Sequence, residues 1–75
     1  MSLLPTRRGA MVRGVTPYTV HGQPYLQIRF SLAGSEHEIH EARLGTEAAY
    51  SPIAENDQII VHTLMNTVTK IEKVG

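Results

Sequence analysis

The amino-acid sequence predicts an all-β protein, a small five-stranded barrel that stays partly open. Three observations predict this fold. Apolar and polar residues alternate strictly from Leu26 to Leu32, which gives a strand one apolar and one polar face. Further short apolar segments follow, separated by turn residues. Only residues 46–50 favour a short helical turn, and no segment has the length or spacing of a long helix.

The composition restricts the classes of function. The 75 residues make one small domain, which buries only roughly 60% of its unfolded surface. The sequence has no cysteine, which excludes disulfides, thiolate zinc sites and thiol chemistry. Seven Lys and Arg balance seven Asp and Glu, which argues against a dedicated binder of duplex DNA or anionic membranes. Four arginines precede the first acid, Glu36, so a local basic patch remains compatible with the neutral total.

The chain contains no apolar run of membrane-spanning length and no charged start followed by an apolar stretch. We therefore expect no direct membrane insertion and a cytoplasmic location, or the soluble part of a longer membrane protein. Residues 1–8, with Arg7 and Arg8, are expected to form a flexible N-terminal tail. Residues 9–75 are expected to form a single small β-barrel domain.

The first predicted strand covers residues 9–20, and Pro17 makes its second half an edge or a bulge. With a loop of residues 21–23, Tyr18 would face Leu26 in the core, and Gly14 would lie opposite Phe30.

The next turn is expected at residues 33–35, with Gly34-Ser35 at its centre, which places Ile39 opposite Phe30. Because His37 and Glu41 share the parity of Ile39, we infer a β-bulge near His40-Glu41 that realigns Ile39 with the apolar residues after it.

Thr46 begins the helical turn, which Ser51-Pro52 ends, and Asn56-Asp57 forms a turn. The last two strands cover residues 58–62 and 68–74, joined by a hairpin in which Asn66 tolerates a left-handed conformation. Apolar residues three apart in the last strand indicate a bulge or a crossing between sheets. The predicted core contains Leu26, Ile28, Phe30, Ile39, Ile59, Val61 and Ile71.

The segment Ile53-Ala54-Glu55-Asn56-Asp57-Gln58-Ile59-Ile60-Val61 joins an apolar residue, a turn ending in Asp and an apolar strand. In this respect the chain resembles the small OB-like soluble domains of bacterial membrane-associated proteins of the NfeD type. It departs from that pattern at Asn56, where such domains usually have glycine. The resemblance implies an OB-like barrel and transfers no functional residues. Strand count alone fits an OB-like or an SH3-like barrel equally well.

Few patterns in the sequence indicate catalysis or metal binding. His37-Glu38-Ile39-His40-Glu41 contains metal-ligand types, but on a strand His37 and His40 point to opposite faces unless the inferred bulge turns them together. No nucleophile motif and no glycine-rich phosphate loop occurs. We therefore expect no catalytic residues, no metal site, no cofactor and no enzymatic activity.

The candidate binding residues lie on the polar face of the second strand. Tyr25, Gln27 and Arg29 share one parity, and Arg13 of the first strand can join them. We expect a non-catalytic interaction or accessory module that contacts a protein partner or a second copy, as a homo-oligomer, through this exposed β face. The alternative is a single-stranded nucleic-acid-binding, OB-like domain that uses the same residues for stacking and charge. A third alternative is a metal-supported binding module.

Overall fold

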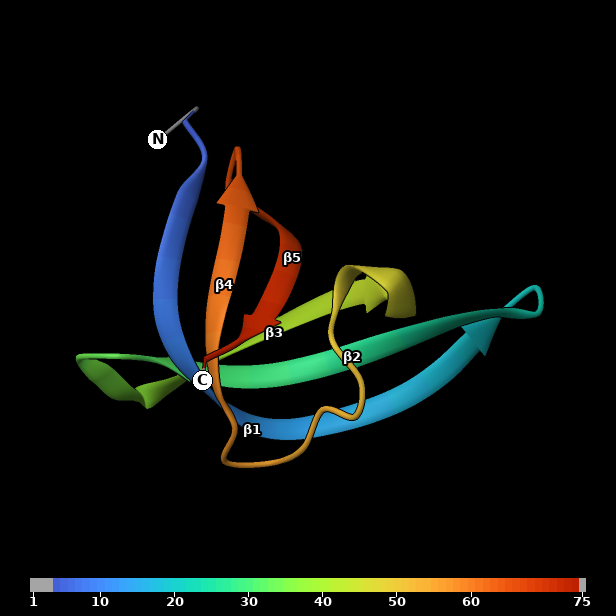
Figure 1. Cartoon of the computed structure of the whole chain (residues 1–75), viewed down its shortest axis with the longest axis horizontal. Coiled ribbons are helices and arrows are strands. Elements are labelled where there is room, and N and C mark those ends of the chain that lie inside the picture. Colours follow the sequence, from blue (N-terminus) through green and yellow to red (C-terminus); the bar gives the residue numbers. More distant parts are fainter. Residues whose placement is uncertain (1–3, 75) are drawn as a thin grey trace.

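The computed structural model describes residues 4–74, which form five antiparallel strands and one short 3-10 turn (Figure 1). The elements are β1 (Thr6–Val20), β2 (Gln23–Leu32), β3 (Ser35–Gly45), η1 (Thr46–Ala48), β4 (Gln58–Leu64) and β5 (Thr67–Lys73). The predicted all-β class, the strand count and the single helical turn near residues 46–50 are confirmed.

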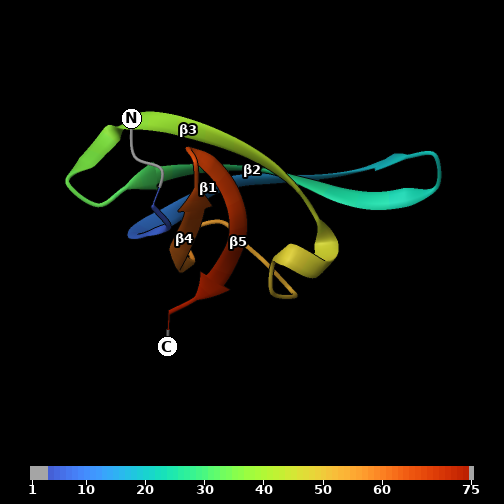
Figure 2. The same ribbon diagram turned by 90° about the horizontal axis from the view of Figure 1, so that it is seen from above.

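The sheet has the strand order β3-β2-β1-β4-β5, with the long strand β1 at its centre. Residues 6–11 of β1 pair with β4, and most of the remainder of β1 pairs with β2. The sheet curls, which brings β3 close to β5 (Figure 2). Its two edge strands, β3 and β5, do not pair. The barrel is therefore partly open, as predicted.

A bulge in β1 marks the point where this strand leaves β4. Val12 pairs with Phe30 and Gly14 pairs with Arg29, so Arg13 is an extra residue. At the same point the N–H of Val12 donates to the Asp57 carbonyl (2.9 Å) and the N–H of Asn56 donates to the Val12 carbonyl (2.8 Å). Pairing of β1 with β4 ends at Met11, so the loop before β4 supplies the hydrogen-bond partners of the Val12 N–H and carbonyl.

The core lies inside the curl and consists of Ala10, Val12, Ile28, Phe30, Ala42, Leu44, Ile59, Val61 and Ile71. Of the predicted core residues, Leu26 is only partly buried and packs against this cluster. Ile39 was wrongly assigned to the core, since 55% of it is exposed. Phe30 pairs with His40 instead, and the register irregularity falls in residues 36–39 of β3 rather than at His40-Glu41. The extra residues carry Ile39 outwards, while Ala42 and Leu44 face inwards as expected.

The first hairpin turn is shorter than expected. Val20 pairs with Gln23, which leaves a two-residue turn of His21 and Gly22 with φ of 50° and 78°. The predicted register was therefore wrong: Tyr18 lies opposite Tyr25, and Gly14 lies opposite Arg29.

The second turn is also displaced by one residue, because Leu32 pairs with Ser35 and leaves Ala33-Gly34 as the turn. Gly34 has a φ of +89°, which favours glycine there.

The predicted N-terminal tail was wrong for residues 6–8, which belong to β1; residues 1–3 lie outside the described part of the chain. Arg7 pairs with His62 and Arg8 pairs with Val61. Pairing with β4, more than fifty residues away, supplies the backbone hydrogen bonds that a tail would lack. Alternation does not reveal this strand in the sequence. Arg8 takes a concave-side position, where an apolar residue would be expected, because this position lies near the open end of the barrel.

The last hairpin agrees with the sequence prediction. Met65 and Asn66 have φ of 53° and 65°, so the left-handed Asn66 is confirmed. The register shifts after His62, because His62 pairs with Lys70 and Thr63 pairs with Val68. Thr69 is therefore an extra residue in β5. This bulge lets Val68 and Ile71, three residues apart, face the same interior.

Candidate functional site

The outer face of β2 carries three of the four predicted binding residues, Tyr25, Gln27 and Arg29. Strand pairing extends this face onto both neighbours, because directly opposite residues share one side of a sheet. Tyr18, Thr16 and Gly14 lie opposite them on β1. Gly45, Arg43 and Glu41 lie opposite them on β3. The structure thus places the predicted residues at the centre of a continuous three-stranded outer surface.

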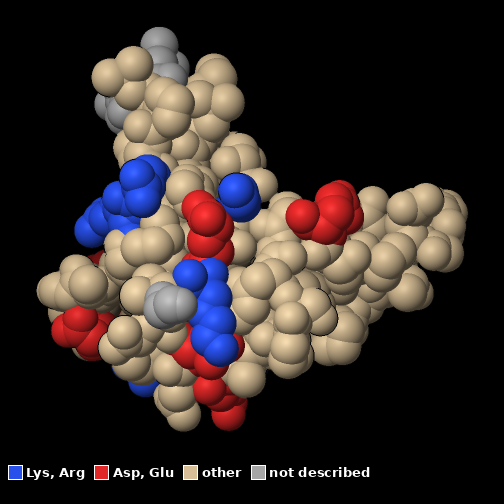
Figure 3. Space-filling view, viewed as in Figure 1, with Lys and Arg blue, Asp and Glu red and all other residues tan. Residues whose placement is uncertain are grey.

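A pair of tyrosines forms one end of this surface. The rings of Tyr18 and Tyr25 stack with centroids 5.6 Å apart and an interplanar angle of 20°. They lie on the arm that β1 and β2 extend beyond the barrel (Figure 1). Residues 14–28 contain no Lys, Arg, Asp or Glu. The space-filling view accordingly shows no charged side chain on the outer part of this arm (Figure 3).

Arg29 forms the middle of the surface and folds over its cross-strand neighbour. A Cβ atom on Gly14 would lie 2.5 Å from Arg29 Nη2 and 3.0 Å from Nε. The guanidinium therefore lies flat across the surface that glycine leaves bare. Glu41, opposite Arg29 on β3, instead has its carboxylate 3.6 Å from Arg43 Nε, and both of these side chains are exposed.

Arg13 extends the surface at the other end. The β1 bulge adds this residue beside Gly14, and its Nε donates a hydrogen bond to Ser31 Oγ at 2.9 Å. Ser31 has the parity of Arg29 and is 1% exposed. The bond therefore holds the Arg13 side chain down on the outer face. All four predicted residues, Tyr25, Gln27, Arg29 and Arg13, lie along one side of the sheet.

Sequence reasoning missed Tyr18 and Arg43 as members of this face. Tyr18 was assigned to the core because a three-residue loop places it opposite Leu26. His21-Gly22 as a two-residue turn with left-handed residues was the signal that would have placed it opposite Tyr25. Arg43 becomes visible only when the β2–β3 register is known, because its pairing with Gln27 follows an irregular stretch of β3.

The histidines considered as metal ligands do not form a site. The ring of His40 stacks on Phe30 with centroids 5.7 Å apart, whereas His37 is exposed. Within residues 4–74, no three His, Cys, Asp or Glu side chains are grouped so as to hold a metal ion. The absence of a metal requirement remains a prediction.

Tyr50 and Asp57 form a hydrogen bond between a phenol and a carboxylate, which we name the Tyr50–Asp57 clamp because it holds the loop before β4. Tyr50 Oη donates to Asp57 Oδ2 (2.6 Å), which also accepts the Ala54 N–H (3.0 Å). Burial is the main cause that raises the pKa of Tyr50, and the hydrogen bond to Asp57 and the charge of Asp57 raise it further. The pKa of Asp57 is lowered mainly by the hydrogen bond from Tyr50 and further by the hydrogen bond from the Ala54 N–H. A protonated phenol and an ionised carboxylate close the loop before β4.

Among residues 4–74, no helix has the length and hydropathy needed to cross a membrane. No protein-family model, curated protein or solved structure matches the chain.

Proposed function

We propose that this protein is a non-catalytic interaction module that contacts a protein partner or a second copy of itself. The contact surface is the outer face of β1, β2 and β3, with Tyr18, Tyr25, Gln27, Arg29 and Arg13 along it; we name this set the tyrosine–arginine face. The observation that carries the proposal is the stacked Tyr18–Tyr25 pair on a projecting arm without charged side chains.

The composition of this face matches that of protein interfaces. Tyrosine and arginine are enriched at the centres of such interfaces, whereas Lys, Glu and Asp are depleted there. The tyrosine pair supplies a rigid aromatic centre, and Arg29 and Arg13 supply polar contacts beside it. Exposed Val20, near the tip of the same arm, adds apolar area. The unpaired edges of β3 and β5 offer a second place for self-association.

The strand order supports an OB-like rather than an SH3-like barrel, which we include in the proposal. β1 lies between β2 and β4, so the fourth strand returns to the first instead of continuing a meander. OB-like barrels are five-stranded, partly open Greek keys that bind ligands on the face of strands 2 and 3. This arrangement agrees with the resemblance to OB-like domains of the NfeD type. A cytoplasmic location is part of the same proposal, since a chain without cysteine suits a reducing compartment.

Single-stranded nucleic acid is the second candidate ligand for the tyrosine–arginine face. The specific observation in its favour is that Tyr25, Arg29 and Arg13 lie on one exposed side, where a base can stack and phosphates can pair. Against it, Tyr18 covers one face of the Tyr25 ring. Because the whole chain is formally neutral, its binding to a nucleic acid would also release few counterions.

The test uses two substitutions of equal charge change on the central strands. Arg29→Glu should weaken self-association or partner binding about tenfold, as expected for a charge reversed within an interface. Arg7→Glu is the matched control, because Arg7 is exposed on the part of β1 that pairs with β4. Sedimentation equilibrium measures self-association, and the effect should depend little on salt if the contact is centred on the tyrosines. Equal effects of both variants would contradict the proposed surface.

An oligonucleotide titration separates the two candidates. We expect no binding of a short single strand tighter than about 10⁻⁴ M at physiological salt. Micromolar, salt-sensitive binding that disappears in Tyr25→Ala would make the nucleic-acid function the better one, because stacking on one tyrosine contributes about 1–3 kcal/mol.

A further inference from the structure

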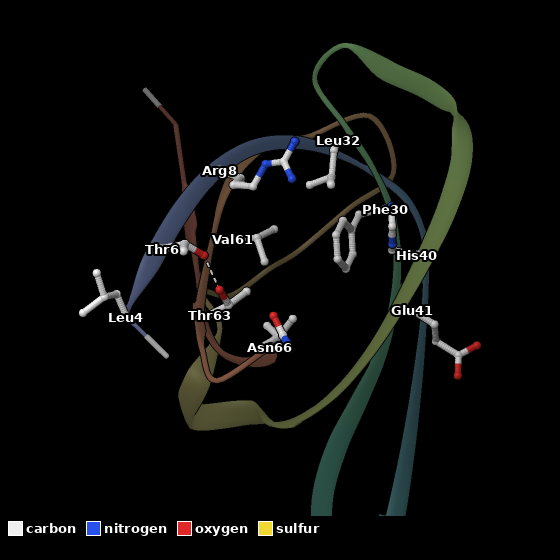
Figure 4. A pocket seen from close by; sticks show the side chains of 11 residues that line it. Leu4, Thr6, Arg8, Phe30, Leu32, His40, Glu41, Val61, Thr63 and Asn66 are labelled. Atoms are coloured by element: carbon white, nitrogen blue, oxygen red, sulfur yellow. Dashed lines mark hydrogen bonds between the residues drawn. The ribbon is translucent and has the colours of Figure 1, made fainter. Parts of the chain in front are cut away.

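The open end of the barrel contains a cavity that the tyrosine–arginine face does not use. It has a volume of about 360 Å³ and lies between the unpaired strands β3 and β5. Residues from all five strands line it (Figure 4). We name it the barrel-mouth cavity. Its size falls at the lower end of the range for small-molecule sites, which runs from about 300 to 1,000 Å³.

The floor of the barrel-mouth cavity is apolar and rigid. Phe30 is 4% exposed and Val61 is 2% exposed, so both are held by the core beneath. Leu32 and Val68 add partly buried walls. A short hydrocarbon chain placed on this floor would leave water at little cost in side-chain order.

One side of the cavity carries the guanidinium of Arg8, which has no anionic partner within residues 4–74. Arg8 pairs with Val61 across β1 and β4, so its side chain starts from the concave side of the sheet. Figure 4 shows its guanidinium pointing towards Leu32 along the edge of the cavity. Among residues 4–74, no carboxylate lies within ion-pair distance of Arg8. Glu41 also lines the cavity, but its carboxylate points away from it and lies 3.6 Å from Arg43 Nε.

The β3 wall of the cavity carries His40. His40 Nε2 is buried and has no hydrogen-bond partner in the described part of the chain. The nearest acidic oxygen, Glu38 Oε2, is 3.9 Å away, which is beyond hydrogen-bond distance. This nitrogen is shielded although 42% of the His40 side chain is exposed, so a ligand reaches it only if the ring turns. Asn66 provides a further polar group at the cavity, whereas the hydroxyls of Thr6 and Thr63 already bond each other.

From these observations we infer that the barrel-mouth cavity binds a small organic monocarboxylate with a short apolar body. The carboxylate pairs with Arg8, for which a guanidinium is well suited. The apolar body rests on Phe30 and Val61. This ligand site is independent of the tyrosine–arginine face, which lies on the convex side of the sheet.

Titration with hexanoate, followed by NMR, tests the inference on the whole protein. We expect saturable shifts of the Val61 methyl and Phe30 ring resonances. Arg8→Gln should weaken hexanoate binding about tenfold or more, as expected for a lost hydrogen bond to a charged group. Arg7→Gln is the matched control, because Arg7 precedes Arg8 and lies on the opposite face of β1. The Arg7→Gln variant should bind hexanoate with the affinity of the unaltered protein.

Hexanamide separates the charge from the apolar body. It should bind the unaltered protein more weakly than hexanoate, and Arg8→Gln should change its affinity little. Val68→Phe should reduce the binding of both ligands by filling the cavity. The inference is overturned if hexanoate produces no saturable shifts at Val61 and Phe30, or if Arg7→Gln and Arg8→Gln weaken binding equally. The titration of the unaltered protein decides the first point even if a variant folds poorly.

Discussion

Arg29 of β2 lies directly opposite Gly14 of β1, and its guanidinium covers the glycine so closely that a Cβ atom there would lie 2.5 Å from Nη2. The pair connects the β1 bulge to the middle of the tyrosine–arginine face. Since the close atom is at the free end of a flexible side chain, a methyl group at residue 14 displaces Arg29 rather than the backbone. The pair therefore links the shape of β1 to the position of a proposed binding residue.

Gly14→Ala should raise the free energy of unfolding by about 0.5 kcal/mol, because alanine restricts the unfolded chain more than glycine does. It should also weaken binding at the tyrosine–arginine face by moving Arg29. Urea unfolding and sedimentation equilibrium measure the two effects. In an Arg29→Ala background the gain in stability should be larger, since no side chain has to move. A loss of more than about 1 kcal/mol would show that Arg29 is held rigidly over the glycine.

Phe30→Ala should lower the free energy of unfolding by about 3–5 kcal/mol, because it opens a cavity in a small core. Ile39→Ala is the control, since Ile39 is 55% exposed and should change stability by less than about 0.5 kcal/mol. Thermal and urea unfolding of the two variants give the comparison. A large loss for Ile39→Ala would mean that Ile39 is buried against something, such as a second copy.

The Tyr50–Asp57 clamp predicts a loss of stability in acid. The pKa of Asp57 is lower in the folded protein than in the unfolded chain, mainly because Tyr50 donates to it. The unfolded state therefore binds the proton more readily. The Asp57 contribution is present above the usual carboxyl pKa of about 3.9 and disappears as the pH falls through the lower folded value. Tyr50→Phe and Asp57→Asn should both reduce this acid loss, measured as unfolding free energy between neutral and acidic pH.

The Tyr50–Asp57 clamp also predicts a loss of stability at alkaline pH. The pKa of Tyr50 is raised in the folded protein, first by burial and then by Asp57. Its contribution is therefore present below the usual phenol pKa of about 10 and decreases as the pH rises above that value. Tyr50→Phe should flatten the alkaline side of the stability curve, whereas a curve identical to that of the unaltered protein would contradict the assignment.

Metal removal should leave stability unchanged. The sequence contains no cysteine, and residues 4–74 hold no group of three metal-ligand side chains. We expect the same melting temperature with and without a strong chelator, because no ligand set couples metal binding to folding. A drop that zinc reverses would direct attention to His37 and His40.

Several features of the fold follow from local chemistry and could be predicted from the sequence. The strict alternation from Leu26 to Leu32 determines which side chains of β2 face the core, because a strand has a period of two whatever its partners are. It also places Tyr25, Gln27 and Arg29 on the other face. Asn66 is one of the few residue types that readily adopts positive φ, so the last hairpin turn was predictable.

Tertiary structure decided how the strands align. Alternation orients side chains within one strand, but it does not determine how many residues a turn uses or where a bulge adds one. The two-residue turn brought Tyr18 opposite Tyr25, and the irregular segment 36–39 turned Ile39 outwards. The pairing of β1 with β4 converted the expected tail at Arg7 and Arg8 into a strand. That contact spans most of the chain, so no local pattern could reveal the cavity that Arg8 lines.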